Sequence, residues 1–451
     1  MATDADTEKG LVPNKCATMC LFGCLTVIGC RSSVVRRLAF YPPQPAGYSI
    51  SSDNQLYIFD GTPGQQQPTS RSAPPPDVVS ASGVASAQGG SAASGDLQRE
   101  SIQHLLRRTG LPERVEVLKI PCGRKESLAG LFLYHPLNPP SIGSHNNTNT
   151  TSGSTPETQS GQPSTAHTPE TPRAEGHRGP GSAGPENSVM IESARRLPCI
   201  IFSHGNSTDI GYMFGLYYRL AYRCRVNVLA YDYSGYGCSD GNTTEKALYR
   251  NIRAVWSYAV NNLKIPPHHL IVYGHSVGSA PCCDLAMREK TYPVGGVVLH
   301  SSLASGLRLF IEDINKSPWF DAFPNVDKLK KVKQTPILII HGQLDRQISW
   351  THSQRLEAAA HFADEQWYKE QQKQQLKAGC RKPGSRRVNG SPSAHSVATE
   401  EMQAQRVQTW WVGNADHNDV EQKSGEAYYR RISDFVSFCT LWAAAHHDGV
   451  M

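Results

Sequence analysis

The sequence lacks any long run of basic residues, and charged residues make up only 19% of its 451 positions. The short basic clusters, such as Arg36-Arg37 and Arg386-Arg387, are far apart, and the formal net charge is only +6. Proteins that bind nucleic acid through phosphates need a concentrated basic surface. We therefore expect no nucleic-acid partner.

Metal-binding motifs are also missing. There is no HExxH motif, and no CxxC pairs with a second CxxC, so a zinc site has little support. The twelve cysteines show no recurring paired spacing and do not predict a disulfide framework. Neither a metal nor a cofactor is implied. Buried free thiols are the expected state of the cysteines in or beside apolar runs, namely Cys199, Cys224, Cys238, Cys282, Cys283 and Cys439.

Large apolar residues are scarce in three tracts, at residues 61–97, about 138–190 and about 364–403. The tracts are rich in polar residues, with Gly, Pro, Ser and Thr prominent in the first two. Such a composition cannot bury a core, so we predict a disordered segment and two disordered insertions in surface loops.

Four cysteines lie in one short apolar segment near the N-terminus, CATMCLFGCLTVIGC. On a helix they fall within a stripe of about 120°. The segment is shorter than the roughly 17–25 residues of a membrane-spanning helix. We predict that residues 1–40 form an S-acylated membrane anchor. The candidate acylation sites are Cys16, Cys20, Cys24 and Cys30.

Arginines follow this segment, at positions 31, 36 and 37, and we expect them to meet anionic headgroups. A signal peptide or signal anchor is the alternative, because Lys9 and Lys15 precede the apolar stretch. No small-residue cleavage site follows it, however. Ala2 excludes N-myristoylation.

The rest of the chain predicts one catalytic domain. Residues 41–60 are proline-led and then aromatic, and we expect them to pack against it. Over 98–451 a first hairpin is followed by β-branched runs that alternate with amphipathic helices. This pattern predicts an α/β fold with a mostly parallel central sheet covered by helices on both faces. Functional groups of such folds collect at the carboxyl ends of the strands.

The sequence Gly274-His275-Ser276-Val277-Gly278 joins a predicted strand to a predicted helix. It is a G-x-S-x-G motif in the strand-turn-helix context of a nucleophile elbow, where the glycines allow a sharp turn that exposes the serine hydroxyl. We predict that Ser276 is the nucleophile of an α/β-hydrolase fold.

A serine hydroxyl needs a base and an orienting acid, which in this fold follow in the order Ser, acid, His. Asp345 comes directly after the predicted strand TPILIIHG, where the acid belongs. His417 lies on a loop between the strand VQTWWV and the last helix. Asp416 shares that loop and is predicted not to orient the base. Asp345 and His417 therefore complete the predicted catalytic triad.

The oxyanion of the transition state needs two N–H donors. We expect them from Val277, which follows the nucleophile, and from Asn206 in the loop Ser203-His204-Gly205-Asn206. Asn206 also begins a glycosylation sequon. A glycan there would block the site, which favours a cytosolic location.

These motifs resemble those of the alpha/beta hydrolase domain-containing protein 17 depalmitoylases. The resemblance covers the proline-led segment and the catalytic core, where His275 stands at a position usually occupied by Gln. The sequence segments that carry it are RRLAFYPPQP, SHGNSTDIGYM, YDYSGYGCSDG, YGHSVGSAP, LHSSLASGLR, DAFPNVDK, IIHGQLD and HNDVE.

The resemblance implies a serine hydrolase that removes palmitoyl groups from S-acylated membrane proteins by thioester hydrolysis. It also implies an acylated N-terminus that holds the enzyme at the cytosolic face of the plasma membrane or endosomes. The sequence leaves two alternative functions open. One is a carboxylesterase or lipid hydrolase of the same fold, because a triad does not specify the leaving group. The other is a catalytically silent membrane scaffold.

Overall fold

The computed structural model describes Met19, Gly23, Cys24 and residues 30–52, 54, 56–59, 99–101, 115–123, 125–135, 197–289, 293–379 and 402–447. The predicted disordered tracts 61–97 and 138–190 lie outside these residues, as do Cys16 and Cys20. None of the helices in the described ranges has the length and hydropathy needed to span a bilayer.

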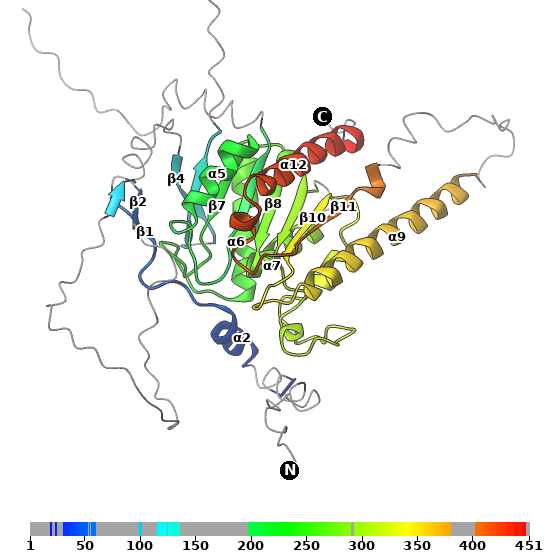
Figure 1. Ribbon diagram of the computed structural model, residues 1–451, viewed down its shortest axis with the longest axis horizontal. Coiled ribbons are helices and arrows are strands. Elements are labelled where there is room, and N and C mark those ends of the chain that lie inside the picture. Colours follow the sequence, from blue (N-terminus) through cyan, green and yellow to red (C-terminus); the bar gives the residue numbers. More distant parts are fainter. Residues whose placement is uncertain are drawn as a thin grey trace, which may run out of the picture.

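A twisted eight-stranded sheet forms the centre of the molecule (Figure 1). Its strands are β4 (Val115–Pro121), β5 (Ser127–Leu133), β6 (Cys199–Ser203), β7 (Asn227–Tyr231), β8 (Leu270–His275), β9 (Gly296–His300), β10 (Ile337–Gly342) and β11 (Val407–Val412). The strand order is β11-β10-β9-β8-β6-β7-β5-β4. All neighbours from β11 to β7 pair in parallel, whereas β5 pairs antiparallel with β7 and with β4. The predicted α/β fold and its first hairpin are confirmed.

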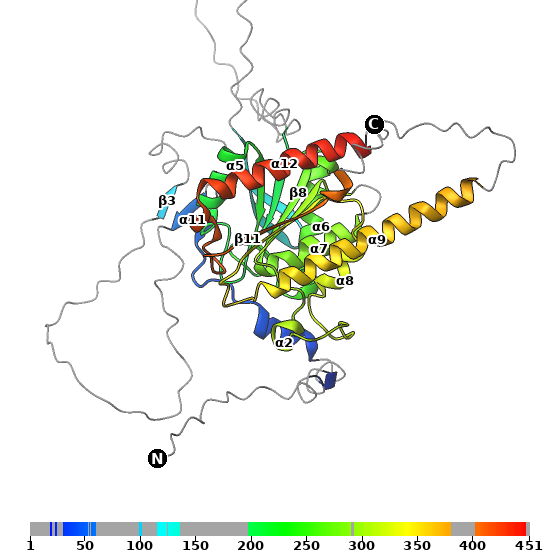
Figure 2. The ribbon, with the colours of Figure 1, turned by 45° about the vertical axis from the view of Figure 1, so that its right-hand side comes forward.

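Helices cover both faces of the sheet (Figures 1 and 2). One hydrophobic cluster joins the sheet to α6 (Glu245–Asn261), α7 (Ser279–Arg288), α8 (Asn325–Leu329) and α9 (Thr351–Gly379). A second cluster joins the other face to α5 (Phe214–Cys224), α11 (Val420–Ser424) and α12 (Glu426–His447). Short 3-10 turns occupy Pro267–His269, Ser276–Gly278 and Leu307–Leu309. Near-complete burial of β6, β7, β9 and β10 explains their continuous apolar sequences.

The N-terminal part of the described chain adds α2 (Arg31–Ala39) and a small antiparallel sheet of β1 (Tyr48–Ile50), β2 (Leu56–Phe59) and β3 (Arg99–Ser101). Residues 41–52 lie against the catalytic domain. The Tyr48 side chain is buried, and its hydroxyl donates to the Asp232 carboxylate over 2.5 Å. The Gly47 N–H donates to Asp209 over 2.6 Å.

Helix α9 corrects the prediction of a disordered insertion over about 364–403. The helix continues through that tract to Gly379 and extends away from the body of the molecule (Figure 1). Its first turns inside the tract are held in place, since the Asp364 carboxylate accepts from the buried Arg406 guanidinium over 2.5 Å. The physical reason is composition. Between residues 364 and 378 the chain has no Gly or Pro and many strong helix formers, namely Ala, Glu, Gln and Lys.

Helix α2 corrects part of the predicted anchor. Residues 31–39 belong to the predicted membrane segment 1–40, yet they pack on the catalytic domain. Arg31, expected to meet lipid headgroups, instead donates to the Glu245 carboxylate over 2.7 Å. Glu245 lies in the first turn of α6, where the helix dipole stabilises a negative charge. Arg31 is therefore a structural residue of the enzyme domain.

Candidate active site

The turn after β8 presents Ser276. This residue has a φ of 54°, a left-handed conformation that is costly for a side chain with a Cβ atom. A Cβ on Gly278 would lie 2.0 Å from the Ser203 carbonyl oxygen, and one on Gly274 would lie 2.5 Å from the Gly278 carbonyl oxygen. Both glycines are thus required by close backbone approach. The strained turn has the geometry of a nucleophile elbow.

The three predicted triad residues meet at the carboxyl edge of the sheet. The distance from Ser276 Oγ to His417 Nε2 is 3.0 Å, and His417 Nδ1 lies 2.7 Å from Asp345 Oδ2. Ser276 follows β8, Asp345 follows β10, and His417 follows β11. All three side chains are buried or nearly so. This arrangement places the His417 ring to accept a proton from the serine hydroxyl.

The Asp345 carboxylate is held by four donors. His417 Nδ1 and His341 Nε2 approach Oδ2 at 2.7 and 3.0 Å, and the backbone N–H groups of Gln347 and Ile348 donate to Oδ1. Burial alone raises the pKa of Asp345, but the hydrogen bonds from His341 and His417 prevail and lower it well below its ordinary value. Asp345 is therefore ionised at neutral pH.

His341 is a residue that the sequence reasoning did not single out. It ends β10, four residues before Asp345. Its Nδ1 atom lies 2.6 Å from Ser353 Oγ, so the serine hydroxyl can donate to Nδ1. The Nε2–H group then lies between the Ile348 carbonyl oxygen, at 2.9 Å, and Asp345 Oδ2, at 3.0 Å. The histidine in the sequence IIHG, just before the acid, was the available clue.

His275 lies beside the nucleophile and is half-buried. Its Nε2 atom is 3.4 Å from the His417 carbonyl oxygen, which also accepts from Ser301 Oγ over 3.2 Å. Burial, followed by the neighbouring His417, lowers the pKa of His275 to about 3. A neutral imidazole at this place contacts the loop that carries the catalytic base without adding a charge beside it.

The loop after β6 is fixed by the N-terminal segment. The Asn206 side-chain oxygen accepts from the Tyr41 N–H over 2.8 Å and from the Tyr236 hydroxyl over 2.7 Å. His204, fully buried, has its Nε2 atom 3.2 Å from the Asp232 carboxylate that Tyr48 also contacts. Tyr41 and Tyr236 thus hold the loop that contains Asn206. The sequence around Asn206 gives no indication of these two partners, which are distant along the chain.

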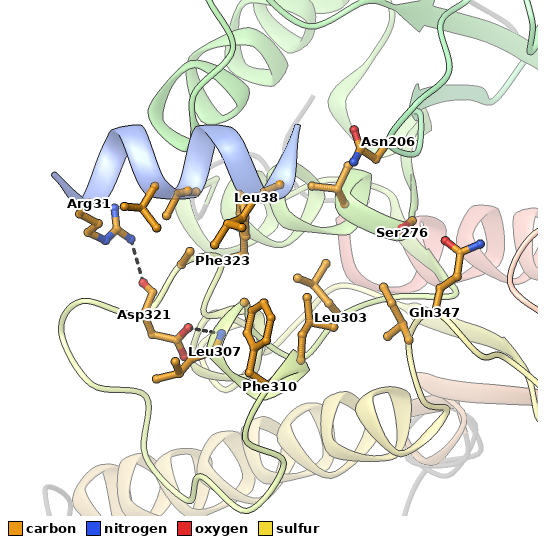
Figure 3. Close-up of a pocket in the computed structure, with 18 of the residues that line it drawn as sticks. Arg31, Leu38, Asn206, Ser276, Leu303, Leu307, Phe310, Asp321, Phe323 and Gln347 are labelled. Carbon is orange, nitrogen blue, oxygen red and sulfur yellow. Dashed lines mark hydrogen bonds between the residues drawn. The ribbon is translucent and has the colours of Figure 1, made fainter. Parts of the chain in front are cut away.

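An apolar pocket of about 230 Å³ opens at Ser276 and His417 (Figure 3). Asn206 and Val277, the predicted oxyanion residues, lie at the same end. From there the pocket runs between α2 and the segment 303–323, and Figure 3 shows Arg31 at the end away from Ser276. The remaining lining is almost entirely aliphatic and aromatic, with Val34, Val35, Leu38, Ala39, Leu303, Leu307, Leu309, Phe310, Phe320, Phe323 and Ile348.

Hydrogen bonds fasten the two walls of this pocket together. Arg31 Nε donates to the Phe320 carbonyl oxygen over 3.0 Å, and Nη2 donates to the Asp321 carbonyl oxygen over 2.8 Å. Glu245 receives both Arg31 and the Phe323 N–H, at 2.7 and 2.9 Å. The Glu245 carboxylate therefore joins α2 to the opposite wall. Sequence reasoning missed this role of α2.

The structure separates the remaining predicted residues from the triad. Asp416 accepts from the Arg346 and His417 N–H groups, so it shapes the base loop and does not contact the His417 ring nitrogens. Cys24 is exposed and Cys30 half-buried, and both are free thiols. Within the described ranges, no group of three or more His, Cys, Asp or Glu side chains has the geometry to hold a metal ion.

A sequence model of the alpha/beta hydrolase family matches residues 200–446, more than half of the chain. The chain belongs to the alpha/beta hydrolase family. The sheet order and the elbow geometry agree with this membership.

This hydrolase is similar to alpha/beta hydrolase domain-containing proteins 17B and 17C. It is 37% identical to human alpha/beta hydrolase domain-containing protein 17B over 238 residues, which are 53% of this chain and 66% of that protein. Protein 17C of Xenopus tropicalis is 35% identical, with 53% and 61% covered. The hydrolase thus spans slightly less than two thirds of these relatives. The structure of the Pyrococcus furiosus esterase Pf2001 is 14% identical, with a TM-score of 0.41, and covers 72% of this chain and 92% of that one.

Proposed function

We propose that this hydrolase removes S-linked fatty acyl groups, such as palmitoyl, from membrane-associated proteins by thioester hydrolysis. The proposal combines a serine hydrolase site with the apolar pocket that begins at Ser276. It also agrees with the similarity to the protein 17 group, whose full length the alignment does not span.

The triad performs the reaction in two steps. Ser276 Oγ attacks the thioester carbonyl carbon while His417 Nε2 takes its proton, and Asp345 stabilises the resulting imidazolium. The N–H groups of Val277 and Asn206 are the proposed donors to the oxyanion. His417 then protonates the departing thiolate, and water, activated by His417, releases the fatty acid from the acyl-enzyme.

The pocket is the observation that carries the substrate assignment. Its lining offers branched and aromatic side chains but few polar groups away from the triad. Burying an acyl chain there is favourable by about 0.8 kcal/mol per methylene. A small polar substrate would leave this apolar surface uncovered. The pocket therefore favours a long-chain acyl group.

Membrane attachment completes the proposal. Four N-terminal cysteines are the proposed acylation sites, of which Cys24 is exposed in the structure. One acyl chain of myristoyl length gives only marginal membrane binding, whereas two or more hold a protein stably. Acylated Cys16, Cys20, Cys24 and Cys30 would keep the enzyme at the cytosolic face of the plasma membrane or endosomes, beside its S-acylated substrates.

A paired-substrate assay tests the proposal. An S-palmitoylated peptide and its oxygen-ester analogue, each carried on phosphatidylcholine vesicles, are offered to the purified full chain. We expect release of palmitate from the thioester and no release by Ser276→Ala. Ser437→Ala, at an exposed position on α12, is the matched control and should behave as wild type.

Three results of this assay would contradict the assignment. Hydrolysis of the oxygen ester alone would indicate a carboxylesterase or lipid hydrolase. No hydrolysis of either compound would favour a catalytically silent scaffold. Equal activity of Ser276→Ala and wild type would remove Ser276 as the nucleophile.

A further inference from the structure

We infer that a second cleft, formed by the outer side of α2 and the loop at 235–243, is a binding site for a phosphate group. The cleft has a volume of about 630 Å³ and does not share a lining residue with the catalytic pocket. It is lined by Ser33, Arg36, Arg37, Phe40, Pro42, Gln44, Gly235, Gly241, Asn242 and Thr243.

The charged side chains that line the cleft are all positive. Arg36 and Arg37 contribute two guanidinium groups, and no carboxylate lines the cleft. Within the part of the chain that the structure describes, Arg37 has no hydrogen-bonding or ion-pair partner, and Arg36 contacts only the Asn242 side-chain oxygen, at 3.2 Å. Guanidinium groups bind phosphate oxygens through paired charge-assisted hydrogen bonds. The lining therefore favours an anionic ligand.

Neutral donors accompany the two cations. The amide oxygen of Asn242, a lining residue, accepts from Arg36, so the NH₂ group of this side chain remains a potential donor. Ser33 and Gln44 add a hydroxyl and a second amide to the lining. A phosphate offers several acceptor oxygens, so it can use this set of donors together.

The walls of the cleft are held by buried contacts. Phe40, which lines the cleft, is buried and packs edge-on against Phe323, with ring centroids 5.9 Å apart. On the other wall the Thr243 hydroxyl donates to the Ser234 carbonyl oxygen over 2.6 Å. The two sides of the cleft are thus parts of the packed domain, and ligand binding would need little ordering of the backbone.

The position of the cleft indicates two sources for such a phosphate. Helix α2 presents Val34, Val35 and Leu38 to the catalytic pocket, while Arg36 and Arg37 line the cleft. The helix begins directly after Cys30, so a phosphorylated lipid headgroup could reach it at a membrane surface. A soluble phosphate compound has the same chemistry. This inference concerns binding alone and does not depend on the proposed hydrolysis.

Binding to two phosphate probes tests the inference. The full chain is made without acyl groups by changing Cys16, Cys20, Cys24 and Cys30 to Ser. It is then mixed with phosphatidylcholine vesicles that contain phosphatidylinositol bisphosphate, and separately with fluorescent inositol trisphosphate. We expect Arg36→Gln combined with Arg37→Gln to weaken binding by about tenfold or more, because charge-assisted hydrogen bonds are lost.

The matched control removes the same charge elsewhere. Lys423→Gln combined with Arg430→Gln changes two exposed cations on α11 and α12, and α12 lies far from α2 in both ribbon views (Figures 1 and 2). We expect this variant to bind as the parent does. Melting temperatures of both variants should match that of the parent, since all four side chains are exposed.

Each outcome decides the inference. Binding of vesicles alone identifies a lipid headgroup as the source, and binding of both probes identifies a general phosphate site. Equal weakening by the two paired variants would show nonspecific attraction and overturn the inference. So would the absence of binding to either probe, or unchanged binding after the loss of Arg36 and Arg37.

Discussion

The catalytic groups and the N-terminal segment at 30–48 meet at one pocket, but they are held in different ways. Ser276, Asp345 and His417 follow strands of the central sheet, whose inner members are fully buried. Helix α2 contains no fully buried residue; Val35 and Ala39 pack against the edge of the core, and Arg31 adds polar contacts. The reactive geometry is therefore set by the core, whereas one wall of the substrate pocket is an added surface element.

This difference predicts separable effects of mutation. Changes at the strand ends should act on every substrate, because they remove the reacting groups. Changes in α2 should act according to acyl-chain length, because only a long chain reaches the wall that α2 forms.

The largest effect is expected at the triad. Asp345→Asn should lower kcat by about 10⁴-fold, because the amide favours the wrong tautomer of His417. Ser276→Ala should abolish labelling by a fluorophosphonate probe. Both losses should be the same for short and long acyl thioesters, measured as initial rates. A loss of activity confined to long-chain thioesters would contradict the claim that the strand-end residues act on every substrate.

The sequence predicted the strand-end residues because their motifs are local. The G-x-S-x-G turn, an acid directly after a β-branched run, and a histidine on the last loop each carry a recognisable context. The capped helix α6 is similar. Thr244 caps this helix, since its side chain accepts from the Ala247 N–H over 3.1 Å. The buried strands follow from their continuous apolar runs.

The pocket wall could not be predicted in this way. The α2 sequence, RSSVVRRLA, has three apolar side chains besides its alanine, and its spacing does not reveal which surface they meet. The partners of Arg31, namely Glu245, Phe320 and Asp321, lie more than 200 positions along the chain. Tyr41 and Asn206 are likewise joined only by tertiary structure. Sequence patterns of short range therefore missed the contacts that shape the substrate site.

The next largest effect is expected from Arg31→Ala. The substitution removes three hydrogen bonds, two to the opposite wall and one to Glu245 on α6, and should loosen the far end of the pocket. Because hydrogen bonds to charged groups contribute about 1.5–3 kcal/mol, we expect kcat/KM for a palmitoyl thioester to fall by about tenfold. An acetyl thioester should be affected about twofold or less. Arg223→Ala, which breaks an exposed pair with Glu426, is the control. Equal losses on both substrates would show that α2 supports the triad itself.

A moderate effect is expected on stability at acid pH. Burial lowers the pKa of His275 to about 3 and of His352 to about 4, and it also lowers that of His300. Between about pH 6.5 and 4 the unfolded chain binds protons there that the folded protein does not, so stability falls as pH falls, by about 1.4 kcal/mol per pH unit for each proton. Asp209 opposes this below its raised pKa of about 6.

The variant His275→Gln isolates one of these protons. Its melting temperature should decline less steeply between pH 6.5 and 4 than that of the wild type, while Arg223→Ala should follow the wild-type slope. The measurement is a thermal melt across this range. Parallel slopes for His275→Gln and wild type would show that His275 gains its proton in the folded state as well.

The smallest effect is expected from the polar tract near residue 165. Deleting residues 145–185 should leave the melting temperature and the rate on a soluble thioester nearly unchanged, because this composition cannot bury a core. As a contrast, Asp364→Ala should lower the melting temperature, since it leaves the buried Arg406 without its carboxylate. A large drop on deletion of 145–185 would reveal a structural role for the tract.

The most direct test of the account is the rate at which fluorophosphonates of different chain length inactivate the enzyme. Such a probe reports the nucleophile and the acyl pocket in one reaction. We predict that a hexadecyl probe reacts faster than an ethyl probe, that both adducts map to Ser276 by mass spectrometry, and that Arg31→Ala reduces the difference. Equal rates for the two probes, or an adduct on another residue, would contradict the claim that the serine opens into a fatty acyl site.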